Sequence, residues 1–231
     1  ILYIRIMKNY VFRDVDEDTV SCVWDSYCNS GATNVVKRRN SEAKGKRYEN
    51  PPYYSIMLNG KLMKGERPWD HRWEMIKSNY NFSGKKVLEF GSNMGLWGIF
   101  ASMEGATSFT AVERDRVSVD VANGLAHEFG VNPTFINMKV GSHNGVINQV
   151  EYNDEDSKWQ GRLGGDYDVV MLLSVLKYMP HKDVMEYVSN FAEVIYEEKD
   201  GTMPMPDIQF FSSYGFTKHK MIGKSERDRP V

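Results

Sequence analysis

The stretch that decides the fold occupies residues 87–98 and reads Val-Leu-Glu-Phe-Gly-Ser-Asn-Met-Gly-Leu-Trp-Gly. Its first four residues are mostly apolar, as in a buried strand, whereas the apolar residues from Leu96 onward have the spacing of a helix. The turn between them contains Gly91 and Gly95, which allow the backbone to approach a ligand closely. The stretch therefore predicts a strand, a ligand-binding turn, and a helix whose first N–H groups face the ligand.

Strands and helices alternate on both sides of this stretch. Pro68 and the apolar face that follows it predict a short helix over residues 68–78. Further helices are expected near residues 96–103, 117–129, 145–149 and 184–191 and just before Tyr214, and further strands at 108–113, 134–138, 167–174, 193–196 and 216–222. The polar segment 152–165 is expected to be a loop outside the core. This alternation predicts a doubly wound α/β fold with a mostly parallel sheet and right-handed crossovers.

Length and composition fit one such domain with an N-terminal extension. The chain has 231 residues, of which 41% are hydrophobic and 26% charged, enough for one well-buried core. We expect residues 1–64 to form an irregular extension or lid and residues 65–231 to form the ligand-binding domain. The extension carries six cations within residues 37–47, and that segment is either a solvated loop or a surface for a phosphate-rich substrate.

Charge and cysteine content restrict the partners and the cellular compartment that we expect for the protein. The formal net charge of −2 gives no attraction of the whole molecule to nucleic acid or acidic membranes. Cys22 and Cys28 are the only cysteines, which favours a reduced, cytoplasmic setting and no bound metal. An apolar run long enough for a membrane span is not present in the sequence. Because the chain begins at Ile1 and stops at Val231, we expect it to be a fragment of a longer protein.

The glycine turn differs from a dinucleotide-binding turn at two positions. Asn93 occupies the place of the second glycine, which in dinucleotide-binding proteins makes room for the pyrophosphate. Glu89 adds a carboxylate that would repel a pyrophosphate. Both differences disfavour a nicotinamide-dependent reductase, and the carboxylate instead suits a cationic ligand.

In these residues the sequence resembles the class I S-adenosylmethionine (SAM) dependent methyltransferases, and the resemblance covers residues 68–231. It implies a seven-stranded type of sheet whose last strand is truncated here. It also implies that SAM is the cofactor, bound by the glycine turn and by an acidic residue after the second strand. The residues that it assigns to the cofactor are Arg72, Glu89, Gly91, Ser92, Asn93, Gly95, Glu113, Ser142 and Ser174.

Three of these assignments depend on particular positions. Glu113 ends the second predicted strand, where the family has an acidic residue that accepts both ribose hydroxyls. The family often places another acidic residue against the adenine after the third strand, but this chain has none there. Either backbone groups or Ser142 would then contact the adenine, or the register differs. Arg72 would bind the methionine carboxylate from a helix that covers the cofactor, whereas the nearby tryptophans are expected to pack against the sheet.

The acceptor is expected at the end of the fourth predicted strand. Residues 174–179, Ser-Val-Leu-Lys-Tyr-Met, lack the Asp/Asn-Pro-Pro-aromatic signature of methyltransferases that act on exocyclic base nitrogens. The resemblance therefore favours transfer to oxygen of a small molecule, glycan or terminal phosphate. We expect Lys177, Tyr178 and His181 to face the acceptor, with His181 as the base for a hydroxyl or Lys177 as the partner of an anion.

Two alternatives of other kinds stay open. The basic N-terminal stretch would suit an RNA methyltransferase, whose binding would weaken with salt. A module with the same fold that binds a partner protein without catalysis is also compatible with the sequence, because no residue here is an obligate catalytic group.

Overall fold

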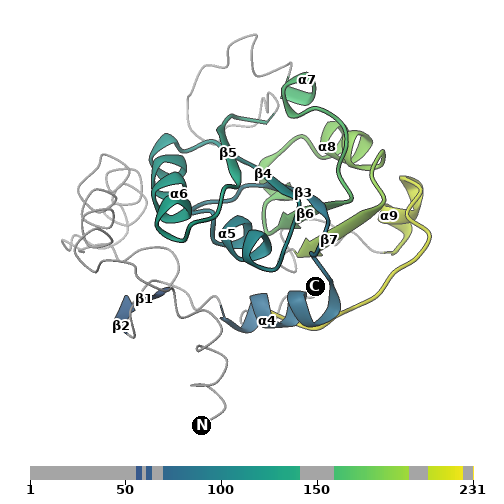
Figure 1. The fold of residues 1–231 in the computed structure, drawn as a ribbon. Coiled ribbons are helices and arrows are strands. Elements are labelled where there is room, and N and C mark those ends of the chain that lie inside the picture. Colours follow the sequence, from purple (N-terminus) through teal and green to yellow (C-terminus); the bar gives the residue numbers. More distant parts are fainter. Residues whose placement is uncertain (1–55, 59–60, 64–69, 141–158, 198–207, 226–230) are drawn as a thin grey trace, which may run out of the picture.

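The computed structural model describes residues 56–58, 61–63, 70–140, 159–197, 208–225 and 231 (Figure 1). Several predictions fall outside these residues, namely those for the basic stretch 37–47, the helix at 145–149, and Ser142. Within the described residues, no helix combines the length and the apolar character needed to cross a membrane.

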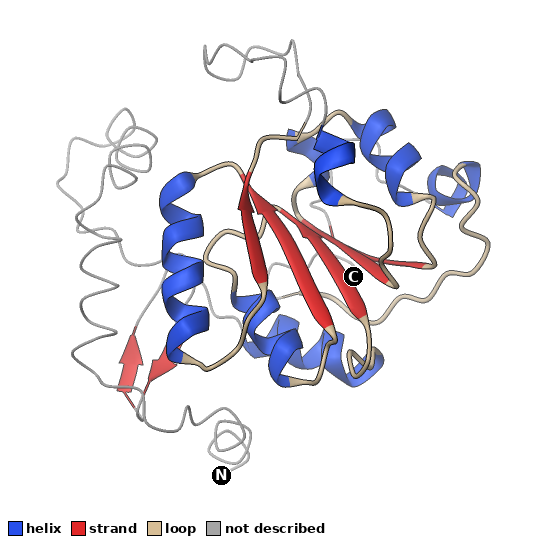
Figure 2. Ribbon diagram, turned by 45° about the horizontal axis from the view of Figure 1, so that its top comes forward, coloured by secondary structure: helices blue, strands red, loops and turns tan. Residues whose placement is uncertain are grey.

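A five-stranded parallel sheet forms the centre of the domain (Figure 2). The strands lie in the order β5-β4-β3-β6-β7. Their bounds are β3 Lys86–Phe90, β4 Ser108–Glu113, β5 Thr134–Asn137, β6 Val169–Leu173 and β7 Glu193–Glu197. The chain therefore builds outward from β3 in one direction, and then returns to place β6 on the other side of β3. This confirms the predicted doubly wound α/β fold.

Helices cover both faces of this sheet (Figures 1 and 2). Buried residues of α4, α5 and α6 belong to one apolar cluster, and those of α7, η3 and α8 belong to a second. The bounds are α4 Asp70–Asn79, α5 Leu96–Met103, α6 Arg116–Glu128, α7 Trp159–Leu163, the 3-10 helix η3 Leu176–Tyr178, α8 His181–Val188 and α9 Ile208–Ser213.

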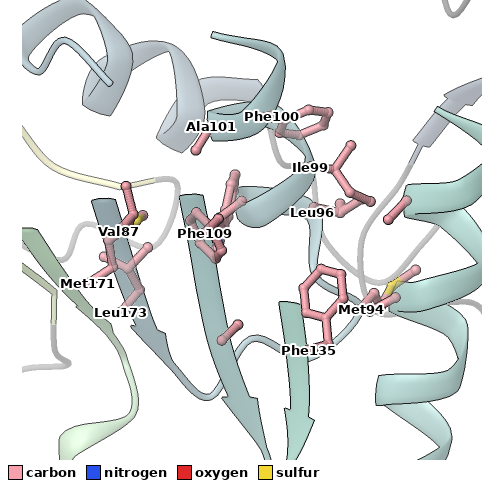
Figure 3. Close-up of a cluster of buried hydrophobic side chains, with 14 of the residues drawn as sticks. Val87, Met94, Leu96, Ile99, Phe100, Ala101, Phe109, Phe135, Met171 and Leu173 are labelled. Atoms are coloured by element: carbon pink, nitrogen blue, oxygen red, sulfur yellow. The ribbon is translucent and has the colours of Figure 1, made fainter. Parts of the chain in front are cut away.

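Successive strand residues contribute to opposite clusters. On β3, Val87 lies in the cluster beneath α4, α5 and α6, whereas Leu88 and Phe90 lie in the other. Figure 3 shows part of the first cluster, in which Val87 of β3, Phe109 of β4 and Met171 of β6 lie on the same side of the sheet as the α5 side chains. This alternation follows from the two-residue period of a strand, and it explains why β6, which is buried on both faces, is apolar throughout.

The structure also shows a two-stranded antiparallel pair, β1 Ile56–Leu58 and β2 Lys61–Met63. It lies within the segment expected to be an irregular extension, so that description is incomplete for these six residues.

Two predictions of secondary structure are wrong. The segment 152–165 was expected to lie outside the core, but it contains α7, whose Trp159 and Leu163 are buried. These two apolar residues lie four positions apart, so one helical turn places them on the same face despite their polar neighbours.

The second error is the strand expected at residues 216–222, which has no regular secondary structure. Residues 217–221 are exposed, Met221 at 71%, and among the described residues they join neither sheet. The backbone N–H of Ile222 instead donates to the carbonyl of Val231 at 2.8 Å, and that of Val231 donates to Gly223 at 3.0 Å.

Candidate functional site

The candidate site lies at the carboxyl ends of β3, β4 and β6. Strand order reverses between β3 and β6, and in open α/β sheets ligands bind in the crevice at such a point. The glycine turn, residues 91–95, leaves β3 on one side of this point, and residues 174–178 leave β6 on the other. The sequence predicted both segments.

Hydrogen bonds hold the glycine turn against β4. The backbone N–H groups of Gly91 and Ser92 donate to the Val112 carbonyl at 2.8 and 3.3 Å. Asn93 adopts a φ of 51°, and its side-chain oxygen accepts the N–H of Met94 at 2.8 Å. Asparagine tolerates this left-handed conformation better than most residues, which explains how it stands where a dinucleotide site would have glycine.

Both glycines of the turn are required by space as well as by backbone angle. Each has a φ of 73°. A Cβ on Gly91 would lie 2.4 Å from Cγ2 of Val175, and one on Gly95 would lie 2.4 Å from Cζ of Phe135. The turn therefore packs closely on the β6 loop at one end and on the sheet at the other.

Glu113 fixes the turn from the end of β4. One of its carboxylate oxygens accepts the N–H of Asn93 and the other accepts the N–H of Asp115, both at 2.9 Å. Burial raises the pKa of this carboxyl, and the two backbone hydrogen bonds partly offset that rise. Each oxygen retains acceptor capacity for a ligand hydroxyl. The structure thus joins Glu113 and Asn93, two residues that the sequence assigned to one site.

Glu89 and Ser92 carry buried polar atoms. The Glu89 side chain is 1% exposed, and neither its Oε2 nor the Ser92 hydroxyl has a hydrogen-bond partner among the described residues. Burial raises the pKa of Glu89 well above its usual range, the negative charge of Glu113 raises it further, and the positive charge of Arg72 lowers it. A buried polar atom without a partner calls for an explanation in a native protein, and a ligand or ion that completes the site is one such explanation.

Arg72 lies in a buried ion pair. Its guanidinium is 3.1 Å from the carboxylate of Glu197, the last residue of β7, and it lies over the ring of Trp97 at 5.9 Å. Both charged side chains are almost fully buried. The predicted contact of Arg72 with the cofactor stays a prediction. Trp73 packs in the core on Phe82 and Trp97, as expected, and Trp69 lies outside the described residues.

The residues expected on the acceptor side, Lys177, Tyr178 and His181, lie along one short segment after β6, which begins with Ser174, a residue assigned to the cofactor. Ser174 has a φ of 59°, and its N–H donates to the Glu197 carbonyl at 2.6 Å. Lys177 and Tyr178 lie in η3, and the Tyr178 side chain is 47% exposed. His181 is the first residue of α8, where its backbone N–H is one of the N-terminal donors of that helix.

The sequence reasoning missed Glu197 and Ser225. The Ser225 hydroxyl donates to Oε1 of Glu197 at 2.8 Å, and both residues are buried. The signal for Glu197 was the two-residue period of β7, which places it on the same face as buried Ile195. A signal for Ser225 is not evident in its local sequence.

Comparison with solved structures supports this fold. The chain aligns with WbdD at a TM-score of 0.53 and 16% sequence identity, over 72% of this chain and 40% of that one. WbdD is described, with another of its structures, as a bifunctional kinase-methyltransferase. This chain has the class I SAM-dependent methyltransferase fold. It spans about two-fifths of the WbdD chain, so the likeness concerns one part of that protein.

Two further similarities are weaker. SMU.776, in complex with S-adenosylhomocysteine, aligns at a TM-score of 0.48 and 16% identity over 76% of this chain and 49% of its own. The ribosomal protein L11 methylase of Lactobacillus delbrueckii aligns at a TM-score of 0.48 and 14% sequence identity, over 66% of this chain and 70% of that one. No protein-family model matches the chain, and no curated protein matches it.

Proposed function

We propose that the protein binds SAM at the carboxyl ends of β3 and β4 and transfers its methyl group to an oxygen of a small molecule, glycan or terminal phosphate. The observation that carries the proposal is the carboxylate of Glu113, which is fixed by two backbone N–H groups beside the glycine turn. A carboxylate held in this way is suited to accept hydrogen bonds from the two hydroxyls of a ribose.

The buried groups of the site fit this cofactor. SAM carries positive charge on its amino group and its sulfonium, and the acidic residues Glu89 and Glu113 both lie at the carboxyl end of the sheet. A pyrophosphate would meet repulsion from the Glu113 carboxylate, and the buried Glu89 carboxyl group offers it no positive charge, which disfavours a dinucleotide. Ser92 offers a buried hydroxyl without a partner among the described residues.

The proposed reaction needs positioning more than strong acid–base chemistry. SAM supplies an activated methyl group, and an acceptor held in line with it gains much of the rate from orientation alone. In this protein Glu113 and the glycine turn would hold the cofactor, and Lys177, Tyr178 and His181 would face the acceptor. His181 would take the proton of a hydroxyl acceptor, whereas Lys177 would pair with an anionic one.

Isothermal titration with S-adenosylhomocysteine tests the cofactor. We expect micromolar binding by the wild type, and the Glu113→Gln variant should bind about 1–3 kcal/mol more weakly, because it replaces an ionised hydrogen-bond acceptor by a neutral amide. Asp120→Asn is the matched control, since Asp120 is an exposed residue of α6 that pairs with its helix neighbour Arg116. Absence of binding by the folded protein, or preference for NADH, would overturn the proposal.

Labelled SAM then tests the acceptor. We expect label on oxygen in a panel of polyols, glycans and terminal phosphates, and little or none on base nitrogens. Transfer to RNA that weakens steeply with salt would instead favour the basic N-terminal stretch as a substrate surface. A protein that binds cofactor but labels none of these acceptors would contradict transfer to oxygen.

A further inference from the structure

A buried charge cluster lies beneath the candidate site, on the face of the sheet that α4 covers. It comprises Glu89 of β3, Arg72 of α4 and Glu197 of β7, each at most 1% exposed. Val87 and Ile195 belong to the apolar cluster under α4. Glu89 and Glu197 each follow one of these residues by two positions in the same strand, so they lie on the same face of the sheet. Among the described residues this cluster has two acids and one guanidinium, and a buried ionised carboxyl group is costly without a proton or a cation beside it.

Arg72 forms an ion pair with only one of the two acids among the described residues. Its guanidinium forms an ion pair with Glu197 at 3.1 Å. Within the described part of the chain no ion pair joins it to Glu89, whose Oε2 has no hydrogen-bond partner. The charged groups that act on Glu89 are Glu113 from β4 and Arg72 from α4. Oε2 of Glu89 is therefore the carboxyl oxygen of this cluster that a ligand can contact.

The segment that follows α9 holds Glu197 in place. Ser225 donates a hydrogen bond to Oε1 of Glu197 at 2.8 Å, so the two carboxylate oxygens of Glu197 contact different partners. The same segment is fastened to α4, because Nε2 of His71 lies 2.9 Å from the carbonyl of Lys224, and Gly223 lies against Met75. Figure 1 shows this segment in yellow, running alongside α4.

We propose that Glu197, fixed by Ser225, holds the Arg72 guanidinium away from Glu89 and so reserves the free oxygen of Glu89 for a cationic group of the cofactor. Glu197 is then a positioning residue, which acts on the cofactor through Arg72 and Glu89. The inference rests on the proposed function, and it adds that the segment around Ser225 takes part in preparing the cofactor site. Because burial raises the pKa of Glu89, we expect the ligand cation to displace a proton from this carboxyl group on binding.

Glu197→Gln tests the proposal, because glutamine keeps the size of the side chain and an oxygen for Ser225 but loses the charge that holds Arg72. We expect Arg72 to pair with Glu89 instead, so that S-adenosylhomocysteine binds about tenfold more weakly, as for the loss of one charge-assisted hydrogen bond. Calorimetry in two buffers of different ionisation enthalpy should show proton release on binding to the wild type and little release with the variant. Glu186→Gln, an exposed acid on α8, is the matched control.

A carbon NMR titration of the ligand-free protein separates this inference from the proposed function. The Glu89 carboxyl, assigned with Glu89→Gln, should titrate at lower pH in Glu197→Gln than in the wild type, whatever the ligand is. If Glu197→Gln does not fold, Glu197→Asp should show a smaller shift in the same direction, because its carboxylate is withdrawn from Arg72. An unchanged Glu89 midpoint would overturn the inference. An NMR shift without any binding of S-adenosylhomocysteine would overturn the proposed cofactor and leave only the charge coupling.

Discussion

Glu89 is a carboxyl group that the fold buries almost completely. Its pKa lies well above the usual range because burial and the charge of Glu113 outweigh the attraction of Arg72. An unfolded glutamate titrates near pH 4.3, so below about pH 4 both states hold the proton. As the pH rises above that value, the unfolded state loses its proton first and folding becomes less favourable, by up to about 1.4 kcal/mol per pH unit, until the folded pKa is reached.

Glu89→Gln should therefore gain stability relative to the wild type as the pH rises from 4 to 7. Glutamine cannot ionise, so it avoids this cost at every pH. Urea unfolding at several pH values measures the difference, and a constant offset between the two proteins across this range would contradict the assignment. Glu186→Gln should show no such trend, because Glu186 is largely exposed.

At this scale the sequence placed Glu113 beside the glycine turn, but it did not predict the partner of Arg72. Glu113 and Asn93 were assigned to one site from the glycine turn and from strand spacing, and they are joined by a hydrogen bond. Arg72 was assigned to the cofactor, and its pairing with Glu197 could not be foreseen because the two residues are 125 positions apart in the chain (197 minus 72). Contacts of this range depend on how α4 sits on the sheet, which no local pattern encodes.

At the scale of elements, the glycine turn should tolerate no side chain at Gly95. An added Cβ would lie 2.4 Å from Phe135 and 2.7 Å from Ala122, at a φ of 73°. We expect Gly95→Ala to destabilise the protein by about 1–3 kcal/mol through overpacking, in addition to the backbone strain. It should also weaken cofactor binding, because a displaced turn separates the Asn93 N–H from Glu113.

Gly130→Ala is the control for this substitution. Gly130 has a φ of 63° but nothing within 4 Å of an added Cβ, so it carries the backbone strain without the clash. Urea unfolding and titration with S-adenosylhomocysteine should give a smaller loss of stability and unchanged affinity for Gly130→Ala. Equal losses in both variants would show that strain alone accounts for Gly95.

Helices and strands were predictable where a single periodic pattern of apolar residues defined them. The β4 bounds and the α5 bounds were predicted from alternation and from helical spacing, and both match the structure. The pair β1 and β2 was missed although Asn59-Gly60, a strong hairpin signal, stands between its strands in the sequence. The strand at 216–222 was expected from its composition and from the family resemblance, but a strand needs a neighbouring edge to pair with, and sequence composition does not supply one.

For the whole molecule, the two apolar clusters share the strands of one sheet. Val87 belongs to one cluster and its neighbour Leu88 to the other, so neither layer can separate without exposing the strands between them. The candidate site uses the carboxyl ends of the same strands, and the net charge of −2 adds no strong long-range field to it. Cofactor binding should therefore be coupled to the unfolding of the domain as a whole.

S-adenosylhomocysteine should raise the unfolding free energy of the described domain in a single transition. A ligand that binds only the folded state adds about 2.7 kcal/mol at a concentration of one hundred times its dissociation constant. At that same concentration Glu113→Gln should gain less, because its weaker affinity lowers the ratio of ligand to dissociation constant, whereas Asp120→Asn should gain as much as the wild type. NADH should give no stabilisation. Calorimetric unfolding with increasing ligand measures this, and two separate transitions, only one of which moves, would show that the site belongs to a part that unfolds independently of the shared sheet.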